Sequence, residues 1–203
     1  SYAALDMLHE QTPLHPDAFL FTAHPLEMFL SGNLKSGFYE NPSMLINLNF
    51  VTFALTGVGR EVSHETRIAN QRSRRNYAPF SLYMIGRIYS ALGGLLTVAG
   101  CYWLGSRLAT ERAAIAAGLL AALALPLVQH AHYAVTSSLA AGFTTLCMVF
   151  AWQALKRNQP FPHLLLSGIF AGLATGNRYN AAVVSLFVLL VGLVLLLRDR
   201  SWR

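Results

Sequence analysis

The chain has 203 residues, of which 54% are hydrophobic and only 12% are charged. Its mean hydropathy of +0.43 is outside the range of ordinary globular domains and indicates an integral membrane protein. A net charge of +6 would suggest nucleic-acid binding in a soluble protein. Here the basic residues gather in short segments between apolar stretches, a pattern typical of membrane topology, so we expect no nucleic-acid partner.

The first part of the chain, residues 1–80, predicts an external loop region with interfacial helices. Residues 17–31 carry apolar side chains at helical spacing, although Pro25 is expected to interrupt that helix. Glycine, asparagine and proline predict a loop over residues 31–42. Residues 43–58 are apolar but too short to span a bilayer, so we expect an interfacial or re-entrant helix there.

The second part of the chain, residues 81–203, predicts a transmembrane bundle of about five helices. A helix needs about 20 apolar residues to cross the hydrocarbon core, a length that the first apolar stretch exceeds and three others approach. The fold class is therefore all-α, a polytopic transmembrane helix bundle. Pro126 predicts a kink in the second helix. The apolar stretches are residues 82–104, 113–129, 138–155, 164–176 and 181–197.

Small residues at four-residue spacing occur in two of these stretches. Such spacing lets helix backbones approach closely, so each set predicts a face on which helices pack. The two sets are Ala113, Ala117 and Ala121, and Gly168, Gly172 and Gly176.

The basic residues predict the orientation of the bundle. If the helices alternate in direction, three basic segments fall on one side, which the positive-inside rule makes cytoplasmic. The N-terminal region then faces outwards and must have been translocated, so we expect a preceding transmembrane helix and a chain that is a fragment of a longer protein. The basic residues are Arg107 and Arg112, Lys156 and Arg157, and Arg198, Arg200 and Arg203.

The outward face gathers most of the candidate chemical groups. A carboxylate, histidines and an arginine near one depth are suited to coordinate a metal, bind a phosphate or activate a hydroxyl. Each residue also has a non-functional interpretation. Asp17 can be a solvated loop residue, and Arg178 can extend its side chain to the membrane interface. The residues on this face are His15, Asp17, His130, His132, Tyr133, Arg178 and Tyr179.

Segments in the same order along the chain resemble the GT-C glycosyltransferases of the dolichyl-phosphate-mannose protein mannosyltransferase and aminoarabinose transferase type. The resemblance covers nearly the whole chain, from about residue 10 to 197. The segments are residues 13–17 (PLHPD) with 28–34 (MFLSGNL), residues 39–43 (YENPS), residues 86–94 (GRIYSALGG) running on to 102–105, and residues 132–136 (HYAVT) with 171–180 (AGLATGNRYN).

The resemblance implies an inverting enzyme that moves a sugar from a polyprenyl-phosphate donor to a protein or lipid acceptor at the outer membrane face. Asp17 matches the catalytic acid of that family, at the start of the first external loop. A carboxylate there would deprotonate the acceptor hydroxyl while cations stabilise the phosphate leaving group. We expect a multi-pass protein of the bacterial plasma (inner) membrane, with the Asp17 loop outside and membrane lipid as a further partner.

The residues expected to bind substrate are His15, His132, Arg178, Tyr179 and Arg87. We assign no metal ligand and no definite cofactor, and leave open a divalent cation.

The chain departs from the family pattern at two acidic positions. Ala18 stands where a second acid usually follows the aspartate, and Ser137 stands where an aspartate is expected after residues 132–136. These departures favour one alternative, a non-catalytic membrane subunit on the same scaffold. A transporter is a further alternative, although the apolar stretches contain no paired-charge pathway.

Overall fold

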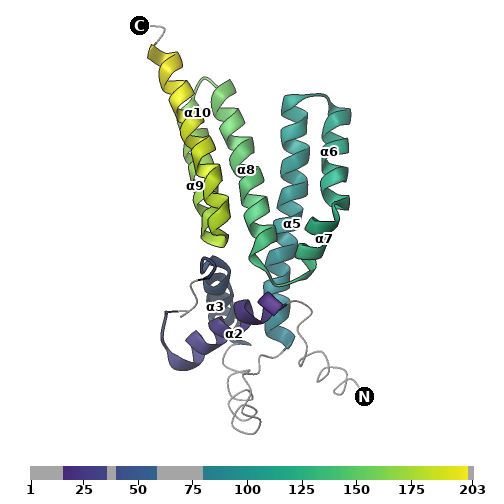
Figure 1. Ribbon diagram of the computed structural model, residues 1–203, viewed down its shortest axis with the longest axis vertical. Helices are drawn as coiled ribbons and strands as arrows, with labels where there is room; N and C mark the ends of the chain where they lie inside the picture. Colours follow the sequence, from purple (N-terminus) through teal and green to yellow (C-terminus); the bar gives the residue numbers. More distant parts are fainter. Residues whose placement is uncertain (1–15, 36–39, 59–79, 201–203) are drawn as a thin grey trace.

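The computed structural model describes residues 16–35, 40–58 and 80–200. All regular structure in these residues is helical, as the sequence predicts. Antiparallel helices form the bundle, and two shorter helices lie across one end of it (Figure 1). The helices of the bundle are α5 (Phe80–Leu108), α6 (Glu111–Leu123), α7 (Leu125–His132), α8 (Thr136–Lys156), α9 (Pro160–Asn177) and α10 (Val183–Arg200), with a short 3-10 helix η1 (Tyr179–Ala182) before α10.

Three described helices are long and apolar enough to cross a membrane: Leu82–Leu108, Thr136–Lys156 and Tyr179–Arg198. The pair α6 and α7 provides a fourth if the two count as one broken span. Helix α9 has 18 residues and begins four residues earlier than the sequence predicts, at Pro160. At 1.5 Å per residue it is about 27 Å long and runs alongside α8 and α10 (Figure 1).

A bend of 55° separates α6 from α7. Ala124 has an extended backbone at the junction, and Pro126 lies at the start of α7. Proline removes a backbone donor and obstructs the preceding turn, so a helix breaks just before it. The predicted kink at Pro126 is confirmed.

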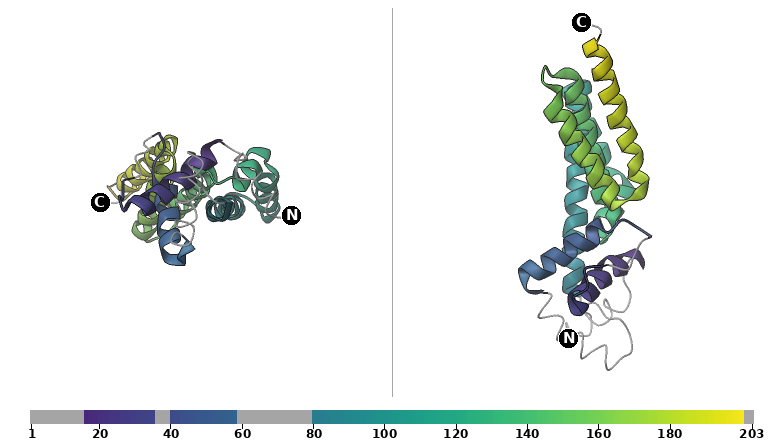
Figure 2. Two further views of the ribbon diagram at one scale, coloured as in Figure 1. Left: turned by 90° about the horizontal axis from the view of Figure 1, so that it is seen from below. Right: turned by 90° about the vertical axis from the view of Figure 1, so that its left-hand side faces the viewer.

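Helices α2 (Pro16–Ser31) and α3 (Met44–Thr56) lie across one end of the bundle, which we call the foot (Figure 2). Helix α3 has only 13 residues and runs crosswise to the antiparallel helices, in agreement with the prediction that this segment does not span. Side chains of α3 bond to two neighbouring helices. Thr52 Oγ1 lies 2.6 Å from Tyr89 Oη on α5, and Asn177 Nδ2 of α9 lies 3.0 Å from Met44 Sδ.

Helix α2 continues through Pro25, although this proline was expected to interrupt the helix. Pro25 has no N–H, so the Phe21 carbonyl loses its partner within the helix. Asn49 of α3 replaces that partner, because its Nδ2 donates to Phe21 O at 2.8 Å. Asn49 is fully buried, so this bond forms where water is excluded. A residue 28 positions away therefore keeps α2 whole.

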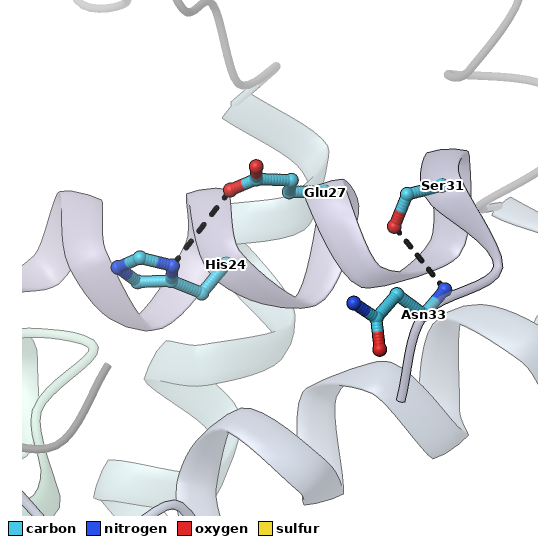
Figure 3. A network of polar contacts seen from close by, with 4 residues as sticks. All are labelled: His24, Glu27, Ser31 and Asn33. Atoms are coloured by element: carbon cyan, nitrogen blue, oxygen red, sulfur yellow. Dashed lines mark hydrogen bonds and ion pairs between the residues drawn. The ribbon is translucent and has the colours of Figure 1, made fainter. Parts of the chain in front are cut away.

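The end of α2 is a conventional C-terminal turn. Gly32 adopts the left-handed conformation with φ of 69°, and its N–H donates to Met28 O at 3.0 Å. The Asn33 N–H then donates to Ser31 Oγ at 3.2 Å (Figure 3). One turn earlier in α2, His24 Nδ1 lies 3.9 Å from Glu27 Oε2. The loop predicted after residue 31 begins here.

The end of the bundle opposite the foot is basic. The turn between α5 and α6 and the turn between α8 and α9 both lie there, with the end of α10 (Figure 1). This arrangement confirms that the predicted basic segments share one side. We call this side the basic end, and its described basic residues are Arg107, Arg112, Lys156, Arg157 and Arg198.

Helices α5 and α8 cross where glycines remove side chains. A Cβ on Gly93 would lie 2.5 Å from Leu139 N, and a Cβ on Gly142 would lie 2.7 Å from Gly93 O. Both distances are shorter than real Cβ contacts allow, so each backbone contacts the other helix directly. A Cβ on Gly86 or on Gly100, each seven residues from Gly93, would lie 2.7 Å from a side-chain atom of Ala134 or of Thr145.

The two predicted packing faces are displaced. On α6 the fully buried residues are Ala114 and Gly118, one position beyond the predicted set. On α9 the buried face is made by Ser167, Ala171, Ala174 and Asn177. A Cβ on Gly168 or Gly172 would meet nothing within 4 Å among the described residues. The glycine spacing on α9 therefore does not mark its contact with α8.

Candidate functional site

A groove of about 590 Å³ lies between α5, α6 and α7. Arg87 and His132 are its ionisable residues, and every other lining residue is apolar. This volume is typical of ligand-binding sites, which are mostly apolar with a few polar groups that fix orientation. The apolar residues are Met84, Ile88, Ala91, Gly94, Leu95, Val98, Ala121, Ala122, Leu127, Val128 and Ala131.

Helix α7, which follows the bend after α6, brings His132 to this groove. His132 lies in the last turn of α7, beyond the end of the apolar stretch predicted over residues 113–129. Its Nδ1 lies 2.7 Å from Val128 O. A carbonyl only accepts hydrogen bonds, so Nδ1 carries a proton and the ring orientation is fixed. The other nitrogen, Nε2, is then the atom through which His132 can bind a further group.

The turn that follows α7 is fastened to α5 by Ser90. Ser90 is fully buried, and its Oγ donates to Val135 O at 2.9 Å and accepts from Val135 N at 3.1 Å. Gly86 leaves room for Ala134 one helical turn before Ser90. These contacts fix the position of residues 132–136 against the segment of α5 that carries Arg87.

Asp17 is the second residue of α2, in its first turn, at the start of the helix expected over residues 17–31. Its neighbour Ala18 is 5% exposed and belongs to a buried cluster with Tyr83 of α5 and Ala134. Arg87 lies one helical turn after Tyr83, and His132 lies two residues before Ala134. The fold therefore brings the backbone beside Asp17 close to the two segments that carry the groove's ionisable residues.

Tyr179 lines a different cavity, about 560 Å³ in volume, between α3 and α9. Tyr179 is 55% exposed at its edge, and Ser43 and Asn47 supply further polar groups. Arg178 is exposed at the C-terminus of α9, where a cation is favourable for the helix dipole, and it lines neither cavity. The structure thus gathers Arg87 with His132 and separates Tyr179 from them. His15 lies outside the described residues.

Comparison with known protein families gives one match. Residues 50–202 match the family described as dolichyl-phosphate-mannose-protein mannosyltransferase. The chain belongs to this family. Comparisons with curated proteins and with solved structures found no match. The protein is accordingly a membrane glycosyltransferase-family member of the mannosyltransferase kind, a family that generally uses polyprenyl-phosphate sugars and protein acceptors.

The family match includes Arg87, His132, Arg178 and Tyr179 but begins after Asp17. The assignment of Asp17 therefore rests on the resemblance of residues 13–17 alone, and the structure describes the backbone of Asp17 within α2.

Of the two departures from the mannosyltransferase pattern, Ala18 occupies a buried position. An acid at position 18 would be buried in the apolar cluster around Ala18 at a high cost in desolvation. Ser137 is half-buried, and the next residue, Ser138, is 1% exposed with its backbone against Gly93. Among the described residues no group of three or more His, Cys, Asp or Glu side chains could hold a metal ion. The divalent cation stays a prediction.

Some residues that shape the site were not singled out from the sequence. Ser90, Gly86 and Gly93 position the turn beside His132 and the crossing of α5 with α8. Their signal was available, because Gly86, Gly93 and Gly100 recur every seven residues, a spacing that keeps one helix face toward a partner. Asn49 carried a weaker signal as a polar residue in an apolar segment.

Proposed function

We propose that this protein transfers a sugar from a polyprenyl-phosphate donor to a hydroxyl of a protein or lipid acceptor at the outer face of the membrane. The observation that carries the proposal is the groove between α5, α6 and α7. It is apolar along its length and carries Arg87 and His132. A polyprenyl phosphate matches this lining, because it combines a long apolar chain with one anionic headgroup.

In this proposal Arg87 binds the donor phosphate. Arg87 is half-buried, so its attraction for an anion is less screened than at an open surface. A guanidinium also binds phosphate through two parallel hydrogen bonds. The His132 Nε2 atom adds a second contact, since the Nδ1–Val128 bond fixes the ring. Arg178, Tyr179 and His15 are further proposed substrate contacts.

The proposed reaction is a single displacement with Asp17 as general base. The Asp17 carboxylate takes the proton of the acceptor hydroxyl, whose oxygen attacks the anomeric carbon. The bond between that carbon and the phosphate oxygen breaks, and the polyprenyl phosphate leaves with its negative charge compensated by Arg87. Attack opposite the leaving group inverts the anomeric centre. No covalent enzyme intermediate is needed, because the phosphate is already a good leaving group.

Binding of undecaprenyl phosphate to the full-length protein tests the groove. Arg87→Gln removes the charge and should weaken binding about ten- to a hundredfold, the worth of a charged hydrogen bond. Ala91→Phe fills the apolar part and should also weaken binding. Matched controls are Arg107→Gln at the basic end and Ala116→Phe on the exposed side of α6, neither of which lines the groove. Equal binding by the groove variants and their controls would contradict the proposal.

A non-catalytic subunit on the same scaffold is the second candidate. Ala18 favours this candidate, because a buried apolar residue stands where the family pattern usually has an acidic one. This candidate predicts that undecaprenyl phosphate binds in the groove while the full-length protein transfers no sugar. A donor-dependent transfer that requires the groove would exclude it.

A further inference from the structure

A second groove, of about 440 Å³, lies at the basic end between the start of α9 and the end of α10. It is at the opposite end of the bundle from α2 and α3 (Figure 1). It is separate from the groove of Arg87, because the two have no lining residue in common. The lining residues are Asn158, Pro160, Phe161, Leu164, Gly192, Leu195, Leu196 and Arg198.

Gly192 leaves the space between α9 and α10. A Cβ at this position would lie 3.7 Å from Leu164 Cδ2, an ordinary contact, so any larger side chain would extend into the groove. The walls are leucines of both helices, and Phe161 at the edge is 73% exposed. The inner part of the groove is therefore suited to a hydrocarbon chain.

Arg198 supplies the charge of this groove. Its Nη1 donates to Leu155 O at 2.9 Å, a carbonyl in the last turn of α8. This bond links α10 to α8 and holds the guanidinium beside the apolar walls. A guanidinium has five N–H donors in a fixed fork, so it can bind an anion as well as a carbonyl.

The surroundings of the groove favour an anion over a neutral headgroup. The turn between α8 and α9, which leads into the groove at Asn158, carries two basic residues, Lys156 and Arg157, and no acidic residue. Lys156 is held over the Trp152 ring, with Nζ 5.1 Å from the ring centroid. Basic pockets between membrane helices at such a face bind lipid phosphates.

We propose that this groove binds an anionic phospholipid of the membrane. The phosphate lies against Arg198, and one acyl chain occupies the space left by Gly192 between α9 and α10. The lipid thereby joins the ends of three helices, because Arg198 also bonds to α8.

Lipid binding to the full-length protein in detergent tests the proposal by native mass spectrometry. The probes are phosphatidylglycerol and phosphatidylcholine with the same acyl chains. Arg198→Ala should weaken phosphatidylglycerol binding about tenfold, as expected for a lost charged hydrogen bond. Arg157→Ala is the matched control, since Arg157 is exposed at the same end and does not line the groove. Equal losses in the two variants would reduce the effect to general surface charge and overturn the proposal.

A second pair of variants tests the acyl-chain part without changing charge. Gly192→Leu fills the groove and should weaken phosphatidylglycerol binding by a similar factor. Gly168→Leu, on α9 where an added Cβ would meet no described residue within 4 Å, should leave binding unchanged. Unchanged binding in Gly192→Leu, or equal affinity of the wild type for the two lipids, would overturn the proposal. Arg87→Gln should not alter phosphatidylglycerol binding, which separates this site from the proposed donor site.

Discussion

Asn49 is expected to stabilise the foot by replacing the hydrogen bond that Pro25 removes from α2. Asn49→Leu keeps the number and branching of the side-chain heavy atoms but has no donor, so the Phe21 carbonyl would be left without its 2.8 Å partner in a buried position. Leaving a buried polar group unpaired costs about 1–3 kcal/mol. We therefore expect the free energy of unfolding to fall by that amount.

A double-mutant cycle isolates this bond from other effects of the substitution. In a Pro25→Ala background, residue 25 regains its N–H and can donate to Phe21 O within the helix. Asn49→Leu should then cost at least about 1 kcal/mol less than it does beside Pro25. The assay is equilibrium unfolding of the full-length protein in one detergent. An equal cost of Asn49→Leu in both backgrounds would refute the reasoning.

Three further predictions concern the bundle and its outer face. Gly93→Ala should destabilise the protein by about 1–3 kcal/mol, because its Cβ would lie 2.5 Å from the α8 backbone. Gly168→Ala should not destabilise it, and equal melting temperatures of the two variants would contradict the close crossing of α5 and α8. A cysteine at Leu34 should react with an impermeant thiol reagent on intact cells and one at Asn158 should not, and the reverse pattern would contradict the orientation. Arg178→Ala should weaken donor binding by about 1.5–3 kcal/mol and Arg178→Lys by less; unchanged affinity would leave Arg178 as a helix-end cation.

The bundle could be predicted from the sequence because its signals are local. Apolar length predicts the long helices, and Pro126 predicts the bend before α7. An alternating order of the helices then places the basic turns at one end of the bundle. Helix α2 could not be predicted in full, because its continuity through Pro25 depends on Asn49, which is 28 residues from the carbonyl it satisfies. The packing face of α9 also depends on its neighbour, so the spacing of Gly168 and Gly172 could not identify it.

The site was predicted only in part for a similar reason. The sequence indicates that the ends of several helices share one face, and the structure brings α2, α7 and the end of α9 to the same end of the bundle (Figure 1). Which residues share a groove depends on the crossing of α5 with α8 and on the bend before α7. Those two features bring Arg87 and His132 together and direct Tyr179 to the cavity beside α3.

Sugar transfer by Asp17→Asn in the full-length protein tests the proposed function most directly. The substitution is nearly isosteric, and asparagine is also accepted at a helix start, so folding should be retained. A lost general base should lower turnover about 10²–10⁴-fold, while binding of undecaprenyl phosphate changes little because the base acts on the acceptor. Transfer by Asp17→Asn at the wild-type rate would contradict the assignment of the base.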